Sequence, residues 1–160
     1  MPCLWLQHNS SQLFVNVGIL DATKINLAAM PVFGGGTAVP QMFVALVDTG
    51  AQATMISSNV VANLNLQPQG KIAIQGVGPN ITYHNGYLFH VAFTIPLTPI
   101  PQGLPPGSQV QVQLAVFILP KAIYGAELTT ASGFDVLLGM DVLSSGSLKI
   151  EGSGHYSFSF

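Results

Sequence analysis

The stretch ALVDTGAQATMIS, residues 45–57, places a carboxylate at the end of an apolar run and beside a glycine. Burying a carboxylate is costly unless it is hydrogen-bonded or has a chemical role. Thr49 can supply a hydroxyl, and Gly50 allows a second backbone to approach closely. Because Asp-Thr-Gly is also an ordinary turn sequence, the rest of the chain must decide whether Asp48 is a catalyst.

The composition describes a folded chain with very few charges. Of its 160 residues 49% are hydrophobic and 6% are charged, against about 25% charged in an ordinary domain. It has no Arg, four Lys and a formal net charge of −2, so we expect no nucleic-acid partner and no anionic membrane partner. The single Cys3 excludes an intrachain disulfide and a cysteine-cluster metal site.

Neither a membrane helix nor a secretory signal is predicted. No apolar run approaches the roughly 18–20 residues that a membrane helix needs, and the N-terminus lacks a basic region. We therefore expect a cytoplasmic protein.

Most of the first hundred residues are predicted to be strands. Runs 12–20 and 25–33 have strand length, and 41–47 is apolar throughout, so we expect it to be buried on both faces. Two serines followed by spaced Val and Leu residues predict one short helix within 57–66. The stretch 71–95 predicts three strands, separated by a glycine turn and by a hairpin turn at its Asn-Gly pair.

The remainder continues the β pattern. Five prolines make 96–107 an extended loop, either a spacer between strands or a polyproline ligand for another domain. A strand over 108–119 follows, then a short buried strand, a glycine break and a helical turn in 134–146, and a hairpin in 147–160. The sum is one all-β, closed barrel-like domain over residues 1–160 with one or two short helices.

Three segments together resemble the retropepsin-like aspartic proteases. ALVDTGAQATMIS is similar to their active-site segment, and IQGVGPNITY (74–83) looks like the glycine-tipped flap. FDVLLGMDVL (134–143) looks like the second signature, which passes beneath the active-site loop. The resemblance covers about residues 25–160 and is closest to cellular or bacterial single-domain members. It implies the retropepsin fold with one lobe per chain and an aspartic endopeptidase activity.

The chemistry of this class needs a second carboxylate. Peptide hydrolysis without a metal, a cofactor or a covalent intermediate needs an activated water and an acid for the carbonyl oxygen. Two carboxylates that share one proton supply both, since one takes a proton from water and the other donates a proton to the carbonyl oxygen. The chain holds a single Asp-Thr-Gly, whereas a two-lobed pepsin needs about twice this length. We expect Asp135 and Asp141 to be surface or capping residues. A C2 homodimer, which places Asp48 opposite its own copy, is therefore the expected assembly.

The resemblance assigns roles to individual residues. Asp48 is the acid and base, the threonine beside it ties the two loops together, and the flap tip gates access of an extended peptide with apolar side chains at the scissile bond. Tyr83 either contacts substrate or packs at the base of the flap. The assigned residues are Asp48, Thr49 and Gly50 for catalysis and Ala51, Gln52, Gly76, Val77, Gly78 and Tyr83 for substrate binding.

The sequence departs from the viral pattern. The viral enzymes often carry an acidic residue and an Arg where this chain has Gln52 and Met140. We expect Gln52 to hydrogen-bond Asp141 in place of that ion pair. The alternative function is a weak or inactive retropepsin-like module for dimerisation or peptide binding, although such a role places no demand on a buried Asp.

Two further expectations concern histidines and the N-terminus. His84 and His90 are separated by the predicted turn, so no metal site is expected there. Residues 1–24 are either an N-terminal strand, which would join the C-terminal HYSFSF in an intersubunit sheet, or a removable leader.

Overall fold

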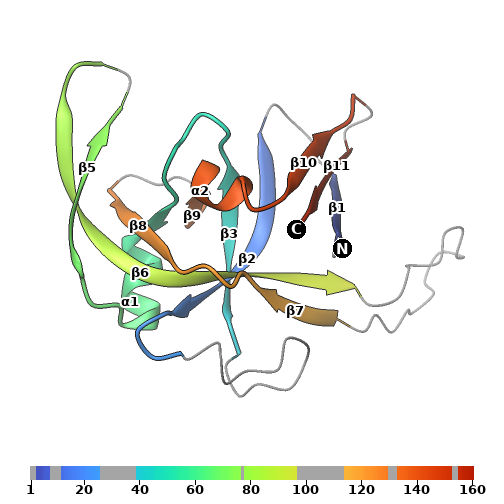
Figure 1. The fold of residues 1–160 in the computed structure, drawn as a ribbon, viewed down its shortest axis with the longest axis horizontal. Coiled ribbons are helices and arrows are strands. Elements are labelled where there is room, and N and C mark those ends of the chain that lie inside the picture. Colours follow the sequence, from blue (N-terminus) through green and yellow to red (C-terminus); the bar gives the residue numbers. More distant parts are fainter. Residues whose placement is uncertain are drawn as a thin grey trace, which may run out of the picture.

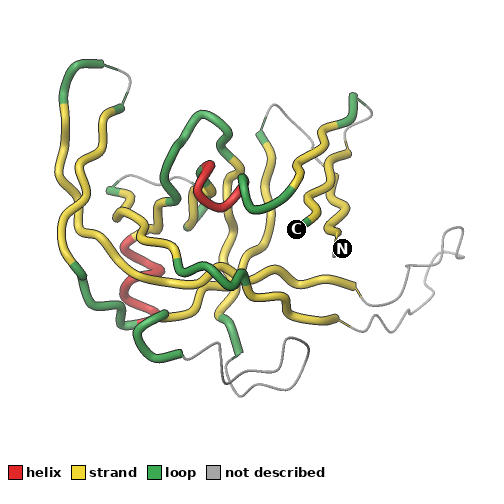
Figure 2. Tube along the Cα trace, in the orientation of Figure 1, coloured by secondary structure: helices red, strands yellow, loops and turns green. Residues whose placement is uncertain are grey.

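The computed structural model describes residues 3–7, 12–25, 39–76, 78–96, 114–129, 133–152 and 155–160. Within these ranges the chain forms eleven strands and two short helices, so the all-β prediction is confirmed (Figures 1 and 2). The predicted strand 25–33 lies almost entirely outside the described residues, as does most of the Pro-rich loop 96–107.

The helices and strands follow one another along the chain in the order of their numbers. The strands are β1 (Cys3–Gln7), β2 (Leu13–Asp21), β3 (Gln41–Val47), β4 (Met55–Ser57), β5 (Gly70–Gln75), β6 (Ile81–Pro96), β7 (Leu114–Ile118), β8 (Ile123–Leu128), β9 (Val136–Leu138), β10 (Ser147–Ile150) and β11 (His155–Ser159), and the helices are α1 (Ser58–Leu64) and α2 (Met140–Leu143). The predicted helix within 57–66, the break before α2 and the terminal hairpin are confirmed.

The strands form two sheets. In the larger one the pairings run β2–β3–β9–β4–β8–β6 and then return from β6 to β2, while β5 and β7 extend from β6. The smaller sheet has the order β1-β11-β10, so β1 pairs with β11 of its own chain. Figure 1 shows the β5–β6 hairpin standing away from the larger sheet, on the side opposite the smaller sheet.

The inward-facing residues of these strands form the hydrophobic core. Val17, Ile19, Phe89 and Val91 are wholly buried, and each pair points to one face of its strand. Gly18 and His90, which lie between the members of these pairs, are buried as well, so this part of the sheet is covered on both faces. Helix α1 adds its buried Val60.

Strand β3 corrects one prediction. Phe43 and Ala45 face the core and are buried, whereas Met42 is 44% exposed and Val44 is 39% exposed. The expectation that this run is buried on both faces is therefore wrong. An apolar run does not reveal whether a second layer covers its outer face, and no described element does so here.

Strand β6 corrects a second prediction, that of a turn within residues 71–95. It runs unbroken from Ile81 to Pro96, so the predicted turn at Asn85-Gly86 does not form. Gly86 instead pairs with Gly70 on one side and with Ala126 on the other. A Cβ atom on Gly86 would lie 2.5 Å from Cζ of Tyr124, because that ring lies against the glycine. The glycine thus makes room for an aromatic ring within a strand.

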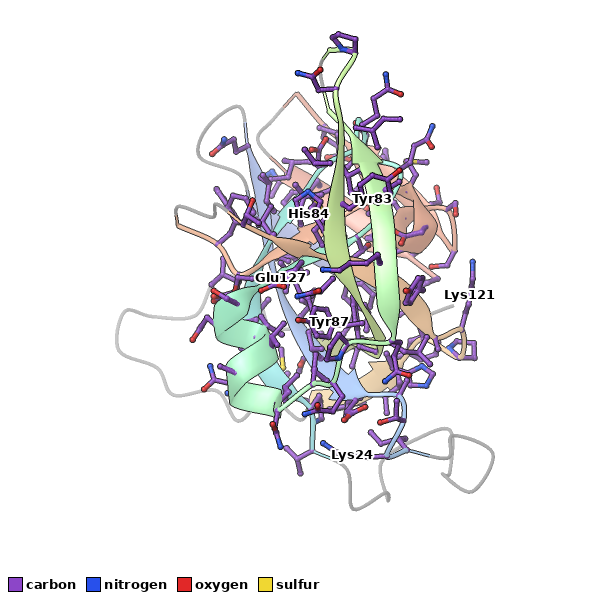
Figure 3. All side chains as sticks on the ribbon, turned by 90° about the vertical axis from the view of Figure 1, so that its left-hand side faces the viewer. Lys24, Tyr83, His84, Tyr87, Lys121 and Glu127 are labelled. Carbon is purple, nitrogen blue, oxygen red and sulfur yellow. The ribbon has the colours of Figure 1, made fainter. Side chains whose placement is uncertain are left out.

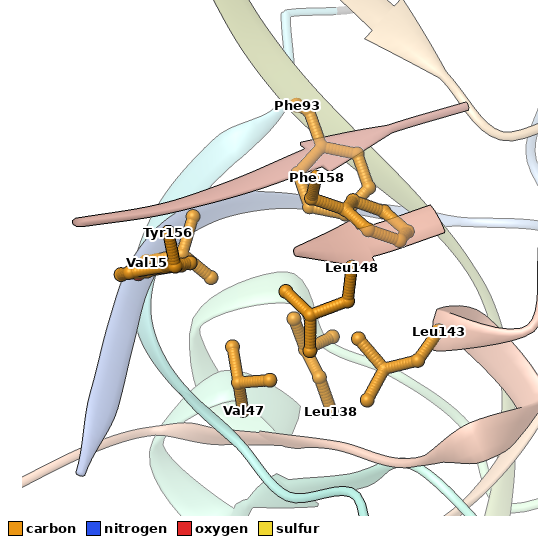
Figure 4. A pocket seen from close by; sticks show the side chains of 8 residues that line it. All are labelled: Val15, Val47, Phe93, Leu138, Leu143, Leu148, Tyr156 and Phe158. Atoms are coloured by element: carbon orange, nitrogen blue, oxygen red, sulfur yellow. The ribbon is translucent and has the colours of Figure 1, made fainter. Parts of the chain in front are cut away.

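The smaller sheet packs on the larger one through aromatic and aliphatic side chains. The Phe93 ring lies 5.5 Å from that of Phe158 and 4.8 Å from that of Phe160. A cavity of about 10 Å³ remains between the two layers, close to the smallest volume that can hold one water. Apolar groups line it (Figure 4), namely those of Val15, Val47, Phe93, Leu138, Leu143, Leu148, Tyr156 and Phe158.

Asp21, buried at the end of β2, provides a test of the fold. Its Oδ1 accepts hydrogen bonds from Thr23, through the amide at 3.0 Å and the hydroxyl at 2.6 Å, and its Oδ2 lies 2.8 Å from Nζ of Lys24. Burial raises the pKa of Asp21, but the hydrogen bonds from Lys24 and Thr23 outweigh it and hold that pKa below 3.8. The stabilisation is therefore present above pH 3.8 and is lost as the pH falls through the lowered pKa.

We expect Asp21→Asn to lower the free energy of unfolding by about 1 kcal/mol at pH 7, because Asn keeps the Thr23 contacts and loses the ion pair. Urea unfolding at neutral pH and at progressively lower pH measures this difference. It should shrink as the wild-type carboxylate becomes protonated, and a difference that stays constant down to acidic pH would contradict the assignment.

Candidate active site

Asp48 is the first residue after β3 and is held there by β9. The two strands are parallel, with Val47 opposite Leu138, and the amide of Asp48 donates to the carbonyl of Leu138 at 3.0 Å. The loop that begins at Asp48 rises beside α2 before the chain enters β4 (Figure 1). The end of a strand buried on one face thus carries the carboxylate to the edge of the core.

The Asp48 carboxylate is organised by its own loop. Its Oδ1 accepts a hydrogen bond from the Gly50 amide at 2.9 Å, and its carbonyl accepts one from the Ala51 amide at 3.3 Å. A Cβ atom on Gly50 would lie 3.2 Å from that Oδ1, so the glycine allows the close approach. Asp48 is half-buried, while Thr49 and Gly50 are exposed in the single chain.

Residues at the start of α2 hold the rest of the loop. The amide of Met140 donates to the Ala51 carbonyl at 2.8 Å, and that of Asp141 donates to the Gln52 carbonyl at 3.2 Å. The expected Gln52–Asp141 contact therefore runs through the main chain. The Asp141 carboxylate takes its hydrogen bonds elsewhere, from Thr54.

Thr54 also belongs to this site, although the sequence did not predict a role for it. It is wholly buried, and its hydroxyl donates to Asp141 Oδ1 at 2.6 Å while accepting from the Gly139 amide at 3.0 Å. The amide of Thr54 lies 3.0 Å from each carboxylate oxygen of Asp141. The only local signal was a hydroxyl residue directly before a short apolar strand.

Asp135, expected to be a surface or capping residue, has its carboxylate at the N-terminal end of α1 without itself being the cap. Its Oδ1 accepts from the Ser57 hydroxyl at 3.1 Å and from Nδ2 of Asn59 at 2.9 Å. Ser57 is itself the N-cap of α1, accepting from the Val60 amide. The carboxylates of Asp135 and Asp141, at the two ends of β9, thus both have structural partners.

The predicted flap segment is the β5–β6 hairpin. Gly76 and Gly78 are exposed in its connecting loop, and Val77 lies outside the described residues. Gly78 has a φ of +138°, a conformation that favours glycine. The Gln75 side chain donates to the Gly78 carbonyl at 3.1 Å, which closes the loop.

The side chains of Tyr83 and Ile81 share one face of this hairpin, since they are two residues apart on β6. Tyr83 is 72% exposed and Ile81 is 55% exposed. Figure 3 shows Tyr83 well above Tyr87, which lies in the body of the sheet. Tyr83 is therefore not packed at the base of the hairpin, which was one of its two expected positions.

A polar cluster joins the hairpin to the sheet at this base. Glu127 Oε2 accepts from Nδ2 of Asn85 at 2.8 Å and from the Tyr87 hydroxyl at 3.2 Å. Lys71 extends the cluster by donating to Oδ1 of Asn85 at 2.7 Å. Burial and the negative charge of Glu127 raise the pKa of Tyr87, so this hydroxyl stays protonated and can donate.

The histidines have separate partners. His84 lies 2.8 Å from the Thr82 hydroxyl, and buried His90 lies 3.2 Å from the Leu119 carbonyl. Among the described residues no group of three or more His, Cys, Asp or Glu side chains is arranged to hold a metal ion. In the same part of the chain, no helix has the length and apolar character to span a membrane.

The site is thus an Asp-Thr-Gly loop at the end of a strand. A Leu-Leu-Gly segment and a short helix hold the loop, an arrangement typical of aspartic proteases. The model of the aspartyl protease family matches residues 32–142, more than half of the sequence, so the chain belongs to that family. Within it, the chain has a retropepsin-like fold.

The fold of this chain is similar to that of a solved retropepsin-like aspartic protease from Rickettsia conorii. The TM-score is 0.53 at 13% sequence identity, and the match covers 98% of this chain and 89% of that one. No curated protein matches the chain.

Proposed function

We propose that the protein is an aspartic endopeptidase that acts as a C2 homodimer, with one Asp48 from each closed, barrel-like lobe. The observation that carries this proposal is the Asp48 carboxylate, held by the Gly50 amide at 2.9 Å at the edge of the core. Because the sequence has one Asp-Thr-Gly, a second chain must supply the other carboxylate.

The proposed reaction uses a dyad that shares one proton, since two adjacent carboxylates cannot both ionise readily. The ionised Asp48 takes a proton from water as the water oxygen bonds to the scissile carbonyl carbon. The protonated copy donates its proton to the carbonyl oxygen, giving a neutral tetrahedral intermediate. The Asp48 that took the proton from water then gives it to the amide nitrogen, while its ionised copy takes a proton from one hydroxyl of the intermediate. The carbon–nitrogen bond breaks, a carboxylic acid and an amine are released, and the dyad again holds one proton.

The residues around the dyad have supporting roles in this proposal. Thr49 links the two loops across the axis, while Gly50, Ala51 and Gln52 bind the substrate main chain. An extended peptide would lie between these loops and the hairpin, making strand-like hydrogen bonds. This pairing leaves alternate side chains to be recognised by pockets.

The β5–β6 hairpin would act as the flap. Gly76, Val77 and Gly78 would form its tip, and closure would exclude water from the dyad. The large exposed area of Tyr83 and Ile81 supports apolar contacts with substrate. We therefore expect hydrophobic residues at the scissile bond.

The smaller sheet supports dimer formation. Among the described strands, β1 and β10 are its edges, and an open edge can pair with another chain. Ile150 on β10 is 56% exposed, an apolar side chain at such an edge. We propose that these strands extend into an intersubunit sheet and that residues 1–160 act as one domain.

Peptide-library cleavage read by mass spectrometry tests the function. Wild type and Asp48→Asn are compared at mildly acidic and at neutral pH, with the oligomeric state measured in parallel. Cleavage by wild type alone would support the protease and reveal its subsites. A wild-type dimer that cleaves nothing at either pH would instead favour a binding module.

A further inference from the structure

The loop that bears Asp48 is hydrogen-bonded to a short segment near the C-terminal end of the chain, residues 138–141. Residues 48, 51 and 52 each hydrogen-bond through the main chain to a residue of 138–141. These bonds depend on backbone alone. The side-chain connection between the two segments is the pair Thr54 and Asp141, which are 87 residues apart.

Thr54 uses its polar groups fully. Its hydroxyl bonds Asp141 and the Gly139 amide, its amide bonds the Asp141 carboxylate, and its carbonyl accepts from the Ala126 amide at 3.2 Å. Buried polar groups so completely paired hold one arrangement, because any shift leaves a donor or acceptor without a partner. Thr54 therefore fixes the C-terminal end of the Asp48 loop.

We infer that Asp141 is a positioning residue for the reaction, which acts through Thr54 to hold the Asp48 loop in its catalytic geometry. This rests on the proposed function. Asp141 does not touch the reacting atoms in that scheme. Its contribution is to keep two copies of Asp48 at the separation that lets them share a proton and a water.

The charge of Asp141 matters to this arrangement. The 2.6 Å bond from the Thr54 hydroxyl has the length of a charge-assisted bond. The remaining contacts are amide donors, from Thr54 at 3.0 Å to both oxygens and from Val142 at 2.9 Å. In Asp141→Asn the oxygen can keep its bonds, but the new NH₂ group would face the Thr54 amide, donor against donor. The loop should loosen without the fold being lost.

Asp135 offers a matched control. It flanks the same strand β9, is half-buried as Asp141 is, and also bonds a hydroxyl and a nitrogen donor. Its contacts hold the start of α1 and do not join the Asp48 loop. Asp135→Asn therefore makes the same chemical change at a site without the proposed role.

The experiment compares the full-length wild type with Asp141→Asn, Asp135→Asn, Thr54→Ser and Thr54→Val on a peptide that wild type cleaves. We expect Asp141→Asn to lower kcat about 10- to 100-fold with little change in KM, since small misplacement of reacting groups costs this much. Thr54→Val should lower kcat by a similar factor. The double variant Asp141→Asn with Thr54→Val should lower kcat no more than the more damaging of the two single changes, because both break the same contact. Thr54→Ser, which keeps the hydroxyl, should retain kcat within about threefold, as should Asp135→Asn.

Amide hydrogen exchange, measured on the dimer without peptide, supplies a readout that does not depend on activity. Exchange at residues 50–54 should accelerate in Asp141→Asn and stay unchanged in Asp135→Asn. Equal kcat for these two variants, or unchanged exchange at 50–54, would overturn the inference. A dimeric wild type that cleaves no peptide would refute the proposed function and the catalytic role with it, while exchange would still show whether Asp141 holds the loop.

Discussion

Replacing Asp48 by Asn is expected to lower kcat/KM by about 10⁴-fold, the upper range for losing an acid–base group. The loss is large because each chain of a homodimer contributes this residue, so one substitution removes both carboxylates. Asn has nearly the same shape, and its Oδ1 can still accept the Gly50 amide that bonds Asp48 at 2.9 Å. Fold and dimer should therefore survive, which circular dichroism and sedimentation would verify.

The same variant separates the two functions considered for this fold. If the protein is a protease, Asp48→Asn should still bind a cleavable peptide, and isothermal titration calorimetry can then measure binding without turnover. Asp135→Asn, which removes a carboxylate bonded to the side chains of Ser57 and Asn59, is the control for loss of an acid elsewhere. Activity of Asp48→Asn within tenfold of wild type would remove the basis for assigning the dyad.

Replacing Gly139 by Ala is expected to destabilise the protein by about 3 kcal/mol and to abolish most activity with it. A Cβ atom at this position would lie 2.5 Å from the Ala53 carbonyl carbon, 2.7 Å from its oxygen and 2.9 Å from the Thr54 nitrogen. All three atoms belong to the backbone of the Asp48 loop. No flexible side chain can move aside, so the loop itself must shift.

The cause of this effect is crowding, not an unusual backbone conformation. Gly139 has a φ of −91° and a ψ of −178°, which other residues adopt readily. Gly152→Ala is the control, because among the described residues, chain neighbours aside, no atom lies within 4 Å of the added carbon there. Urea unfolding should show a change within about 0.5 kcal/mol for Gly152→Ala. A Gly139→Ala protein as stable as wild type would mean that the loop and α2 do not approach as described.

The parts of the fold that follow local rules could be predicted from the sequence. Ser57 caps α1 as its position before the apolar residues indicated. The Asp-Thr-Gly triplet follows an apolar strand, and Gly139 separates β9 from α2. Each of these depends on neighbours within a few residues.

The errors arose where distant contacts decide the outcome. Asn85-Gly86 is a strong local turn signal, yet the chain stays extended there because Gly86 lies between two strands and against the Tyr124 ring. The exposure of Met42 depends on which layers cover β3, which its own sequence does not state.

The Thr54–Asp141 pair could not be predicted from the sequence for a related reason. Its members are separated by 87 residues, and each alone looks like an ordinary polar residue. Its role becomes evident only when β9 and α2 are placed against the Asp48 loop.

In the proposed mechanism one active site needs Asp48 from two chains, and subunit mixing measures this requirement. Wild type and Asp48→Asn are unfolded together in equal amounts, refolded, and assayed against a cleavable peptide at fixed total protein. If both carboxylates are required, only wild-type homodimers are active, and about a quarter of the wild-type activity should remain. Retention of about one half, the value for chains that act independently, would contradict the shared site.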